Sequence, residues 1–405
     1  MQYEYIDIFS GCGGLSLGLC NSGWKGIFAV EKNRDAFETL KINLIVRKKH
    51  FSWVDWLSVE NHDINELLLN KSEQLKTLEG KVPLVVGGPP CQGFSMAGQR
   101  NKNDIRNKLV KSYIEFIKLI RPSYLFFENV HGFTVGFKNK NNKKGRPMSE
   151  YIVSQLKEIG YNVASDVVDI SDYGVPQKRK RFILVGSLNS DPKVFFKMLK
   201  DQKTNFLKEK KLTAFTSVED AIGDLLYKNK KVPSPDSTGF FSGTYGTATS
   251  NYQKYMRNGI SNNIPNSHRF AKHKQYTISL FEKMISECPH GKRLSKKNTN
   301  IDGFKRRGIT ILEANKQCNT ITSHPDDYLH YSEARILTVR ECARIQSFPD
   351  WYEFSGKYTT GGQLRKIEVP RYSQVGNAIP PLFAEQVGYV IKKMMENDTN
   401  GKSVF

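Results

Sequence analysis

The chain has 405 residues and a formal net charge of +21, because 61 Lys and Arg residues stand against 40 Asp and Glu residues. This length exceeds what a single small hydrophobic core organises, so we expect two domains. The positive charge is larger than solubility requires and indicates a polyanionic partner such as nucleic acid. A well-solvated basic surface is the simpler alternative.

The six cysteines are scattered, with no CxxC pair and no Cys/His cluster at zinc spacing. This pattern argues against a disulfide framework and against a structural metal. The N-terminal stretch carries acidic residues and no basic leader, and no apolar run approaches the length of a membrane span. We therefore expect a cytoplasmic protein with reduced thiols, without a metal and without a membrane partner.

A glycine-rich turn follows the first predicted strand. Residues 5–9 (YIDIF) predict a short strand, and a helix is expected to begin near Leu15. Between them, Gly11, Gly13 and Gly14 permit a tight turn and a close approach of the backbone to a ligand. This strand–turn–helix order is typical of nucleotide-type cofactor sites, although many such turns bind nothing.

Two acidic residues are candidates for contacts with an adenosine group. The predicted strand at residues 26–30 ends in Glu31, where a carboxylate could accept hydrogen bonds from ribose hydroxyls. Asp63, which we also place at a strand end, could accept a hydrogen bond from an adenine amino group. A helix cap or a solvated surface position is the ordinary role of such acids.

Taken in series, the glycine turn and the two acids predict a Rossmann-like α/β fold that holds an adenosine-containing ligand. The turn is not a GxGxxG fingerprint, and no Walker Lys-Ser/Thr pair is present. A bound pyrophosphate is therefore not indicated. This favours S-adenosylmethionine over NAD and ATP.

The segment at residues 87–95 (GGPPCQGFS) follows an apolar run at residues 82–86 that predicts a buried strand. Its glycines and prolines end the strand and predict a loop where α/β proteins usually bind ligands. Cys91 stands at the apex of this loop. Most free cysteines are small buried side chains, but two stiff prolines and a polar segment around Cys91 favour an exposed nucleophile.

Charged residues also flank two later predicted strands. Glu128 follows the buried run at residues 124–127, and a carboxylate at the end of a core strand is costly to desolvate unless it has a task. Gln177, Arg179 and Arg181 alternate before the predicted strand at residues 182–186. They form either a basic turn or a set of donors that project together toward a base or a phosphate.

The order of these motifs resembles that of the DNA (cytosine-5) methyltransferase family, in its bacterial restriction–modification form. The resembling segments are DIFSGCGG (residues 7–14), GGPPCQGFS (87–95), ENV (128–130), QKRKR (177–181), LTVRECARIQSFPD (337–350) and QVGNAIPP (374–381). They cover most of the chain except roughly residues 188–315. A single one of these motifs would be weak evidence, but six in the family's order make chance a poor explanation.

The resemblance implies a Rossmann-like S-adenosylmethionine-dependent methyltransferase domain with a smaller, loop-rich target-recognition domain. We expect the catalytic and cofactor-binding domain over residues 1–187 and the target-recognition domain over residues 188–332. Residues 333–405 are expected to return to the catalytic domain, with a C-terminal helix at about residues 381–394. A monomer that binds double-stranded DNA is implied, and a cognate restriction endonuclease acting on the same site is a further implied partner.

The resemblance also implies a mechanism. The target cytosine is flipped out of the duplex, and the Cys91 thiolate attacks carbon 6 of the ring. Glu128 contacts ring nitrogen 3 and the exocyclic amine, and Arg181 holds the base oxygen with the help of Arg179. Carbon 5 then receives the methyl group, and no metal is required.

The family's functional residues carry over onto this sequence at matching positions. The implied DNA contacts are Gln92, Ser95 and Gln177. The implied cofactor contacts are Phe9, Gly11, Gly13, Gly14, Glu31, Asp63, Ile64, Pro90, Asn377 and Ala378.

Two other classes of protein compete with this interpretation. A tRNA cytosine-5 methyltransferase would share the catalytic half, but the CQGFS segment and the long variable region favour DNA. A catalytically silent nucleic-acid-binding protein would tolerate the loss of Cys91, Glu128 or the arginines, all of which are present. A Rossmann oxidoreductase gives no reason for the PPCQ and QKRKR segments.

Overall fold

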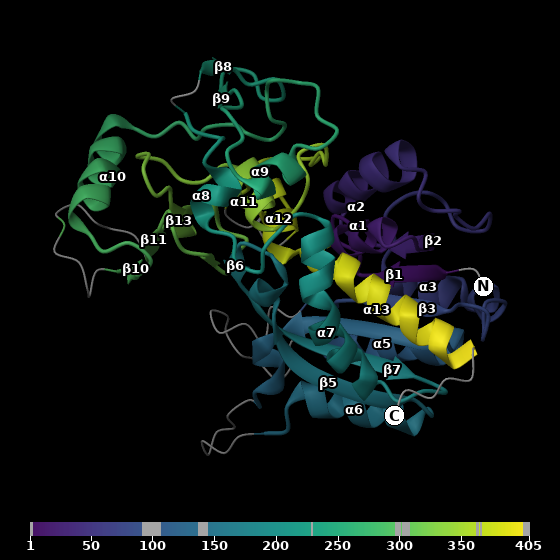
Figure 1. The fold of residues 1–405 in the computed structure, drawn as a ribbon. Coiled ribbons are helices and arrows are strands. Elements are labelled where there is room, and N and C mark those ends of the chain that lie inside the picture. The colour runs from purple at the N-terminus through teal and green to yellow at the C-terminus, as the bar shows by residue number, and fades with distance from the viewer. Residues whose placement is uncertain are drawn as a thin grey trace. The chain divides into compact units, whose positions relative to one another are not determined.

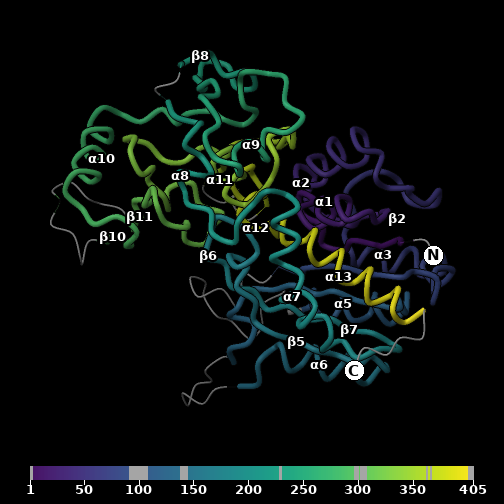
Figure 2. Tube along the Cα trace, viewed as in Figure 1, coloured from purple at the N-terminus to yellow at the C-terminus, as the bar shows by residue number. Residues whose placement is uncertain are grey.

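The structure is a computed structural model that describes residues 3–90, 107–136, 145–227, 230–295, 301, 308–361, 364 and 367–399 (Figures 1 and 2). The chain divides into two compact units. Unit 1 comprises Met1–Asp169, Lys180–Lys203 and Ala384–Phe405, and unit 2 comprises Ile170–Arg179 and Thr204–Phe383.

Unit 1 is built on a six-stranded sheet in the order β2-β1-β3-β4-β7-β5. Strands β1, β2, β3 and β4 run parallel, and β7 runs antiparallel between β4 and β5. The α/β class predicted from the sequence is therefore confirmed. The strands are β1 (Glu4–Ile8), β2 (Lys25–Val30), β3 (Leu84–Gly87), β4 (Tyr124–Val130), β5 (Asn162–Asp169) and β7 (Lys180–Ser187).

The core strands of unit 1 form where short apolar runs occur in the sequence. Strands β1 and β3 carry Ile, Leu and Val side chains that are fully buried, as expected for parallel strands covered on both faces. The helices of unit 1 are α1 (Gly14–Asn21), α2 (Arg34–Leu40), α3 (Ile64–Asn70), α4 (Ser72–Lys76), α5 (Asn107–Ile120) and α6 (Met148–Glu158), together with parts of α7 (Lys193–Glu209) and α13 (Pro381–Thr399).

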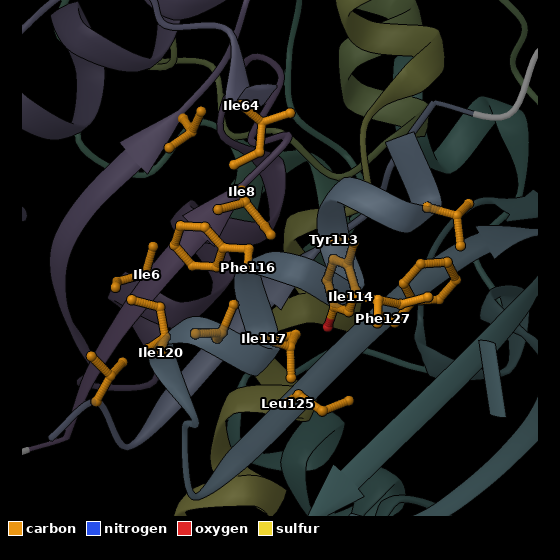
Figure 3. Close-up of a cluster of buried hydrophobic side chains, with 14 of the residues drawn as sticks. Ile6, Ile8, Ile64, Tyr113, Ile114, Phe116, Ile117, Ile120, Leu125 and Phe127 are labelled. Atoms are coloured by element: carbon orange, nitrogen blue, oxygen red, sulfur yellow. The ribbon is translucent and has the colours of Figure 1, made fainter. Parts of the chain in front are cut away.

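One face of the sheet is covered by α5 and its neighbours (Figure 3). Side chains of α5, including Tyr113, Phe116 and Ile117, pack against Leu125 and Phe127 of β4 in one buried cluster. The apolar positions of α5 recur at helical spacing, so the helix turns one stripe of side chains toward the sheet. This packing buries one face of β4.

The opposite face carries α1, α7 and α13. Ring contact between Phe126 and Phe195 joins β4 to α7 on this face, because Phe126 alternates with the residues that meet α5. Helix α13, yellow in Figure 2, packs against α1 near the purple end of the chain. The Trp24 indole after α1 donates a hydrogen bond to the Gly388 carbonyl of α13 at 3.0 Å.

Unit 2 has short strands and short helices. Helix α10 (Gln275–Glu287) packs Phe281 and Met284 onto the three-stranded sheet β10-β11-β13. The strands of unit 2 are β6 (Gln177–Lys178), β8 (Lys231–Pro233), β9 (Phe241–Gly243), β10 (Arg293–Leu294), β11 (Ile309–Ile311), β12 (Cys318–Asn319) and β13 (Tyr328–Leu329). Its other helices are α8 (Val218–Ile222), α9 (Asn251–Met256), α11 (Val339–Ile345) and α12 (Arg371–Asn377).

The compact units follow a different division from the predicted functional domains. Residues 170–179 and 333–383 pack with unit 2, whereas the sequence analysis assigned them to the catalytic part. Packing and function need not share boundaries, so the target-recognition domain at residues 188–332 stays a prediction. Among the described residues, no helix is both long and apolar enough to cross a membrane.

Candidate active site

The sheet of unit 1 brings four strand ends to one edge. Strands β1, β2, β3 and β4 are parallel, so their carboxyl ends meet there, and the antiparallel strand β7 begins at the same edge. The chain runs from β1 to β2 on one side and then crosses to β3 on the other side of β1. Open α/β sheets bind ligands at such a switch point. The candidate site therefore lies outside the ends of β1 and β3.

The glycine-rich turn after β1 has the backbone that its sequence predicts. Gly11 and Gly13 adopt φ values of 56° and 85°, a left-handed region that favours glycine, and Phe9 has a φ of 61°. A Cβ added to Gly11 would meet no atom within 4 Å. Gly13 is the N-cap of α1, and Gly14 is its first residue. The turn thus brings bare backbone to the switch point.

Glu31 lies directly after β2 and faces this turn. One carboxylate oxygen accepts a hydrogen bond from the backbone N–H of Gly11 at 2.9 Å, and the other accepts one from Asn33 at 2.7 Å. Burial raises the pKa of the Glu31 carboxyl, and the backbone donors only partly oppose this effect. The backbone N–H of Lys32 is a third donor to this carboxylate, which has about four lone-pair sites, so Glu31 can still accept a hydrogen bond from a ligand.

The expectation that Asp63 ends a strand is wrong. Asp63 is instead the N-cap of α3, and its carboxylate accepts a hydrogen bond from the backbone N–H of Asn65 at 2.8 Å. It also pairs with the ammonium of Lys32 at 2.7 Å. Burial pushes the pKa of Asp63 up, but the bonds from Lys32 and Asn65 outweigh it and lower the pKa overall. Ile64 is buried in the core beneath this helix.

The backbone after β3 passes beside Glu128. A Cβ on Gly88 would lie 3.1 Å from a carboxylate oxygen of Glu128, and the Asn129 amide donates a hydrogen bond to the Pro89 carbonyl at 3.1 Å. Pro90 is exposed. The next residue is Cys91, which, like the predicted DNA contacts Gln92 and Ser95, lies outside the described residues.

Glu128 and Arg181 form an ion pair at this edge, with 2.8 Å between the guanidinium Nε and the carboxylate. Their strands place them together, because Val130 of β4 pairs with Arg181 of β7. Each side chain keeps 11% of its surface exposed. Burial lowers the pKa of the Arg181 guanidinium, and the charge of Glu128 opposes this effect. The pair is therefore desolvated but still accessible.

Gln177 and Arg179 lie elsewhere, in the interior of unit 2. Gln177 is fully buried and bonds Gln346, and the Arg179 guanidinium donates to the backbone carbonyls of Gly376 and Ala378 at 3.0 Å each. The partners of these two side chains are protein groups, whereas Arg181 pairs with Glu128. The alternating pattern therefore does not give three donors with one common target.

The predicted cofactor contacts Asn377 and Ala378 stand at the end of α12, also in unit 2. Asn377 is exposed, and the carbonyl of Ala378 is held by Arg179. Sequence reasoning treated these two residues and Arg179 as separate sites. The structure joins them.

Asp7 is a buried acid that sequence reasoning left without a role. It lies in β1 and accepts a hydrogen bond from the Ser16 hydroxyl of α1 at 2.5 Å. Burial raises the pKa of Asp7 to about 7, the Ser16 bond opposes this, and the nearby Glu31 charge adds to it. The sequence could have revealed Asp7, because it is an acidic residue inside a predicted apolar strand. Asp7 ties the turn-bearing helix to the sheet.

Three of the described cysteines are buried, unlike the exposed environment that the sequence predicts for Cys91. None of the five described cysteines forms a disulfide. Burial raises the pKa of the Cys12, Cys318 and Cys342 thiols, which keeps them protonated and unreactive. Within the described part of the chain, no group of three or more His, Cys, Asp or Glu side chains could hold a metal ion.

Known proteins resemble this chain over nearly its whole length. It is 32% identical over 403 residues to the Type II methyltransferase M.DdeI of Desulfomicrobium norvegicum, with 97% of this chain and 89% of that protein covered. It is 28% identical over 407 residues to the Type II methyltransferase M.MthTI of Methanothermobacter thermautotrophicus, with 99% and 100% covered.

Solved structures share the fold. A crystal structure of a DNA modification methyltransferase encoded within an E. coli prophage matches with a TM-score of 0.65 and 22% identity, covering 98% of this chain and 100% of that one. The structure of the S. pombe Dnmt2 methyltransferase matches with a TM-score of 0.56 and 16% identity, covering 98% and 100%. The family model for C-5 cytosine-specific DNA methylases matches residues 3–393, so the chain belongs to the C-5 cytosine-specific DNA methylase family.

Proposed function

We propose that the protein transfers a methyl group from S-adenosylmethionine to carbon 5 of a cytosine in a specific short sequence of duplex DNA. The observation that carries this proposal is the Glu128–Arg181 pair, desolvated at the carboxyl edge of the sheet. The Gly88–Pro89 backbone beside it leads within two residues to Cys91. A carboxylate and a guanidinium at this edge, with a cysteine close by in the sequence, suit nucleophilic addition to a polarised ring.

The residues around the switch point fit S-adenosylmethionine. The open backbone at Gly11 leaves room for a ligand, and Glu31 has lone pairs for ribose hydroxyls. The described charge that faces the glycine turn is the Glu31 carboxylate, and the Lys32 ammonium is neutralised by Asp63. Such a site disfavours a pyrophosphate and suits a cofactor that carries a sulfonium. Phe9, Gly13, Gly14, Ile64 and Pro90 complete the proposed cofactor site in unit 1.

The chain's own residues perform the proposed chemistry as follows. The Cys91 thiolate forms a bond to carbon 6 of a flipped cytosine, which makes carbon 5 nucleophilic. Glu128 hydrogen-bonds ring nitrogen 3 and the exocyclic amine, and Arg181 orients Glu128 while it holds the base oxygen. S-adenosylmethionine supplies the methyl group when bound. Loss of the proton from carbon 5 then lets Cys91 leave and restores the aromatic ring.

The surface of β8 and β9 in unit 2 supports DNA as the substrate. The Lys231 ammonium lies 4.0 Å from the ring centre of Phe241, which is 44% exposed. Arg269 and Lys272 lie 4.1 and 4.6 Å from the ring centre of Phe240. Cations interleaved with aromatic rings suit phosphates and bases. We therefore propose that residues 188–332 recognise the target sequence.

The relatives named as Type II methyltransferases support a role in restriction and modification. We propose that methylation protects the host DNA from a cognate endonuclease that cuts the same sequence. An enzyme that modifies cellular DNA in this way acts in the cytoplasm, and a single chain with one catalytic edge suffices as a monomer. No step of the proposed reaction requires a metal.

The test is bisulfite sequencing of DNA from a bacterial host that expresses the protein, beside a host that expresses Cys91→Ser. We expect one short recurring sequence with a protected cytosine, absent with the variant. The purified variant should still bind S-adenosylhomocysteine, because the cofactor site does not depend on the thiol. Protection by Cys91→Ser would refute the nucleophile. If neither host shows protection, labelled methyl transfer to purified RNA would establish an RNA methyltransferase instead.

A further inference from the structure

Three polar side chains lie buried together in unit 2 and belong to distant parts of the sequence. Gln177 and Gln346 have no exposed surface, and Arg179 is 1% exposed. Gln177 and Arg179 come from the QKRKR segment, and Gln346 follows α11. Burying such groups is costly unless they are hydrogen-bonded. We call these three residues the polar clamp.

The polar clamp binds backbone carbonyls of two separate segments, one at Ile321 and the other at residues 375–378. The Arg179 guanidinium donates to the carbonyl of Ile321 at 3.2 Å and to those of Gly376 and Ala378 at 3.0 Å each. The Gln346 amide donates to the carbonyl of Val375 at 2.6 Å. Three of the four carbonyls in residues 375–378 are therefore held by buried donors.

Gln177 links the members of the clamp. Its amide donates to the Gln346 side-chain oxygen at 2.6 Å and to the Ile345 carbonyl at 3.1 Å. Its own side-chain oxygen accepts a hydrogen bond from the backbone N–H of Ile321 at 3.1 Å. Ile321 is thus bound through its N–H by Gln177 and through its carbonyl by Arg179. The clamp is a connected network, in which each bond orients the next.

The segment at residues 375–378 is also held sterically. A Cβ on Gly376 would lie 2.7 Å from the backbone nitrogen of Ser323 and still closer to the Thr322 carbonyl. Contact with backbone at this distance cannot be relieved by a side-chain movement. Only glycine fits, and the segment cannot shift toward residues 322–323.

We propose that the polar clamp is a positioning device for Asn377 and Ala378, and that Arg179 acts through their backbone without touching DNA or the base. This inference rests on the proposed function and on the contact between these two residues and the cofactor that the family resemblance implies. Asn377 is exposed, whereas the carbonyls before and after it are fixed by Arg179. The clamp therefore determines where the exposed peptide and side chain of Asn377 point.

The geometry requires the fork of an arginine. The guanidinium reaches Ile321 with one terminal nitrogen and both Gly376 and Ala378 with the other. The ammonium of lysine is a point charge on one atom and cannot span the two sides of the clamp. Arg179→Lys should keep the buried charge but free the carbonyl of Gly376 and leave that of Ala378 with only the 3.4 Å bond from Gln346.

Arg340 provides a matched control in the same unit. It is fully buried and donates to three backbone carbonyls, those of Asn266 (2.9 Å), Pro349 (3.2 Å) and Tyr352 (2.6 Å). None of these carbonyls belongs to a predicted ligand segment. Arg340→Lys should therefore destabilise unit 2 much as Arg179→Lys does, without moving residues 375–378.

The experiment measures S-adenosylhomocysteine binding by calorimetry and thermal unfolding of the unloaded protein, for the wild type and both variants. We expect the Kd to rise about tenfold in Arg179→Lys, as the loss of one or two hydrogen bonds predicts. Arg340→Lys should keep the wild-type Kd, although its midpoint temperature of unfolding falls by about as much as that of Arg179→Lys. In turnover, Arg179→Lys should raise KM for the cofactor and leave kcat nearly unchanged.

Several results would overturn the inference. An equal change of Kd in both variants would reduce Arg179 to a purely structural residue. An unchanged Kd for S-adenosylhomocysteine together with weaker DNA binding would indicate that Arg179 contacts a phosphate, as the sequence predicts. The proposed function would not be affected by this result. If the wild type binds no S-adenosylhomocysteine, both proposals fail. Should Arg179→Lys not fold, Gln346→Glu replaces it, since it removes the donor to Val375 and should raise the Kd in the same direction.

Discussion

The two units use buried charges in different ways. In unit 1, the Glu128–Arg181 pair keeps 11% of each side chain exposed and stands at the edge of a regular sheet. In unit 2, Arg335 holds both carboxylate oxygens of Glu341 at 2.7 and 2.8 Å, and the Glu341 side chain has no exposed surface. The Glu128 carboxylate is therefore open to a ligand, whereas the Glu341 carboxylate can serve only its protein partners.

Unit 2 needs its internal charges because its strands are too short to hold it together. All seven of its described strands have two or three residues, so their ladders supply few hydrogen bonds. Arg344 compensates by joining Asp224 at 2.8 Å and Asp350 at 2.6 Å, two residues more than a hundred positions apart. Tyr245 donates to the same Asp350 at 2.7 Å. The loop-rich unit is thus cross-linked by buried arginines.

The largest expected effect comes from removing one charge in each unit. Glu128→Gln should lower kcat by about 10²- to 10⁴-fold, because the residue serves the reacting base. It should destabilise the protein less than Glu341→Gln does, because the Glu128–Arg181 pair keeps part of its surface in water. Glu341→Gln should lower the free energy of unfolding by about 3–5 kcal/mol, because it leaves Arg335 short of its main counter-charge. Turnover per folded molecule and urea unfolding measure the two effects.

Two outcomes would contradict this contrast between the two ion pairs. A Glu128→Gln protein that unfolds as readily as Glu341→Gln, but whose folded fraction turns over normally, would make the edge pair structural. A Glu341→Gln protein with wild-type stability would show that unit 2 does not depend on its internal charges.

Acid should destabilise the protein through three buried histidines. Burial lowers the pKa of His50 and His330 to about 3 and that of His268 to about 4. The ordinary value near 6.5 applies in the unfolded chain, which therefore binds protons that the folded protein refuses. The stabilising effect is complete above pH 6.5 and is lost as the pH falls toward 4, by about 1.4 kcal/mol per pH unit for each histidine.

Two of these histidines, His268 and His330, belong to unit 2, so hydrogen exchange at pH 5.5 should detect opening of unit 2 before unit 1. His330 faces Arg335, which disfavours its protonation, and Glu341, which favours it. In a His330→Gln protein, the free energy of unfolding in urea should depend less on pH, by about 1.4 kcal/mol per pH unit. A slope identical to the wild type would contradict the assignment.

The smallest expected effect concerns the two acids near the glycine turn. Glu31→Ala should weaken S-adenosylhomocysteine binding by about 1–2 kcal/mol, because it also removes the acceptor that holds the Gly11 N–H. Asp63→Ala should cost less, since Lys32 already neutralises that carboxylate. Glu66→Ala, an exposed acid on the same helix as Ile64, is the control. Calorimetry with cofactor product and with DNA should show that DNA binding changes less, and the reverse order would refute the adenosine contacts.

Local patterns in the sequence were sufficient for the sheet and for part of the site. Strands β1 and β3 are short and mainly apolar and lead into turns rich in glycine or proline, so the strands and the positions of Gly11 and Glu31 after strands could be predicted. Glu128 was expected just after its strand but lies within β4, two residues before its end. The parallel pairing then brings these ends to one edge. Nothing beyond periodicity and turn chemistry was required.

The remaining features depend on contacts between distant residues. Asp63 is an exception, because it caps α3 through the N–H of Asn65, a local role that the sequence analysis named as the alternative to a strand end. Arg179 was expected at a base or phosphate, but carbonyls almost two hundred positions away take its donors. No local pattern reveals such partners, because a buried arginine and a DNA-binding arginine look alike in sequence. Unit 2, which is organised by side-chain bonds of this kind, was therefore the least predictable part.

The close fit of α13 on α1 has a consequence for how the protein is made. Gly18 of α1 touches Ala384 and Glu385 so tightly that no side chain fits between them. Domains usually fold from the N-terminus while the ribosome is still adding residues. Here the first helix waits for its partner until residues 204–383 have been translated. A ribosome that stalls in unit 2 therefore releases a chain whose methyl-transfer sheet still lacks its last covering helix.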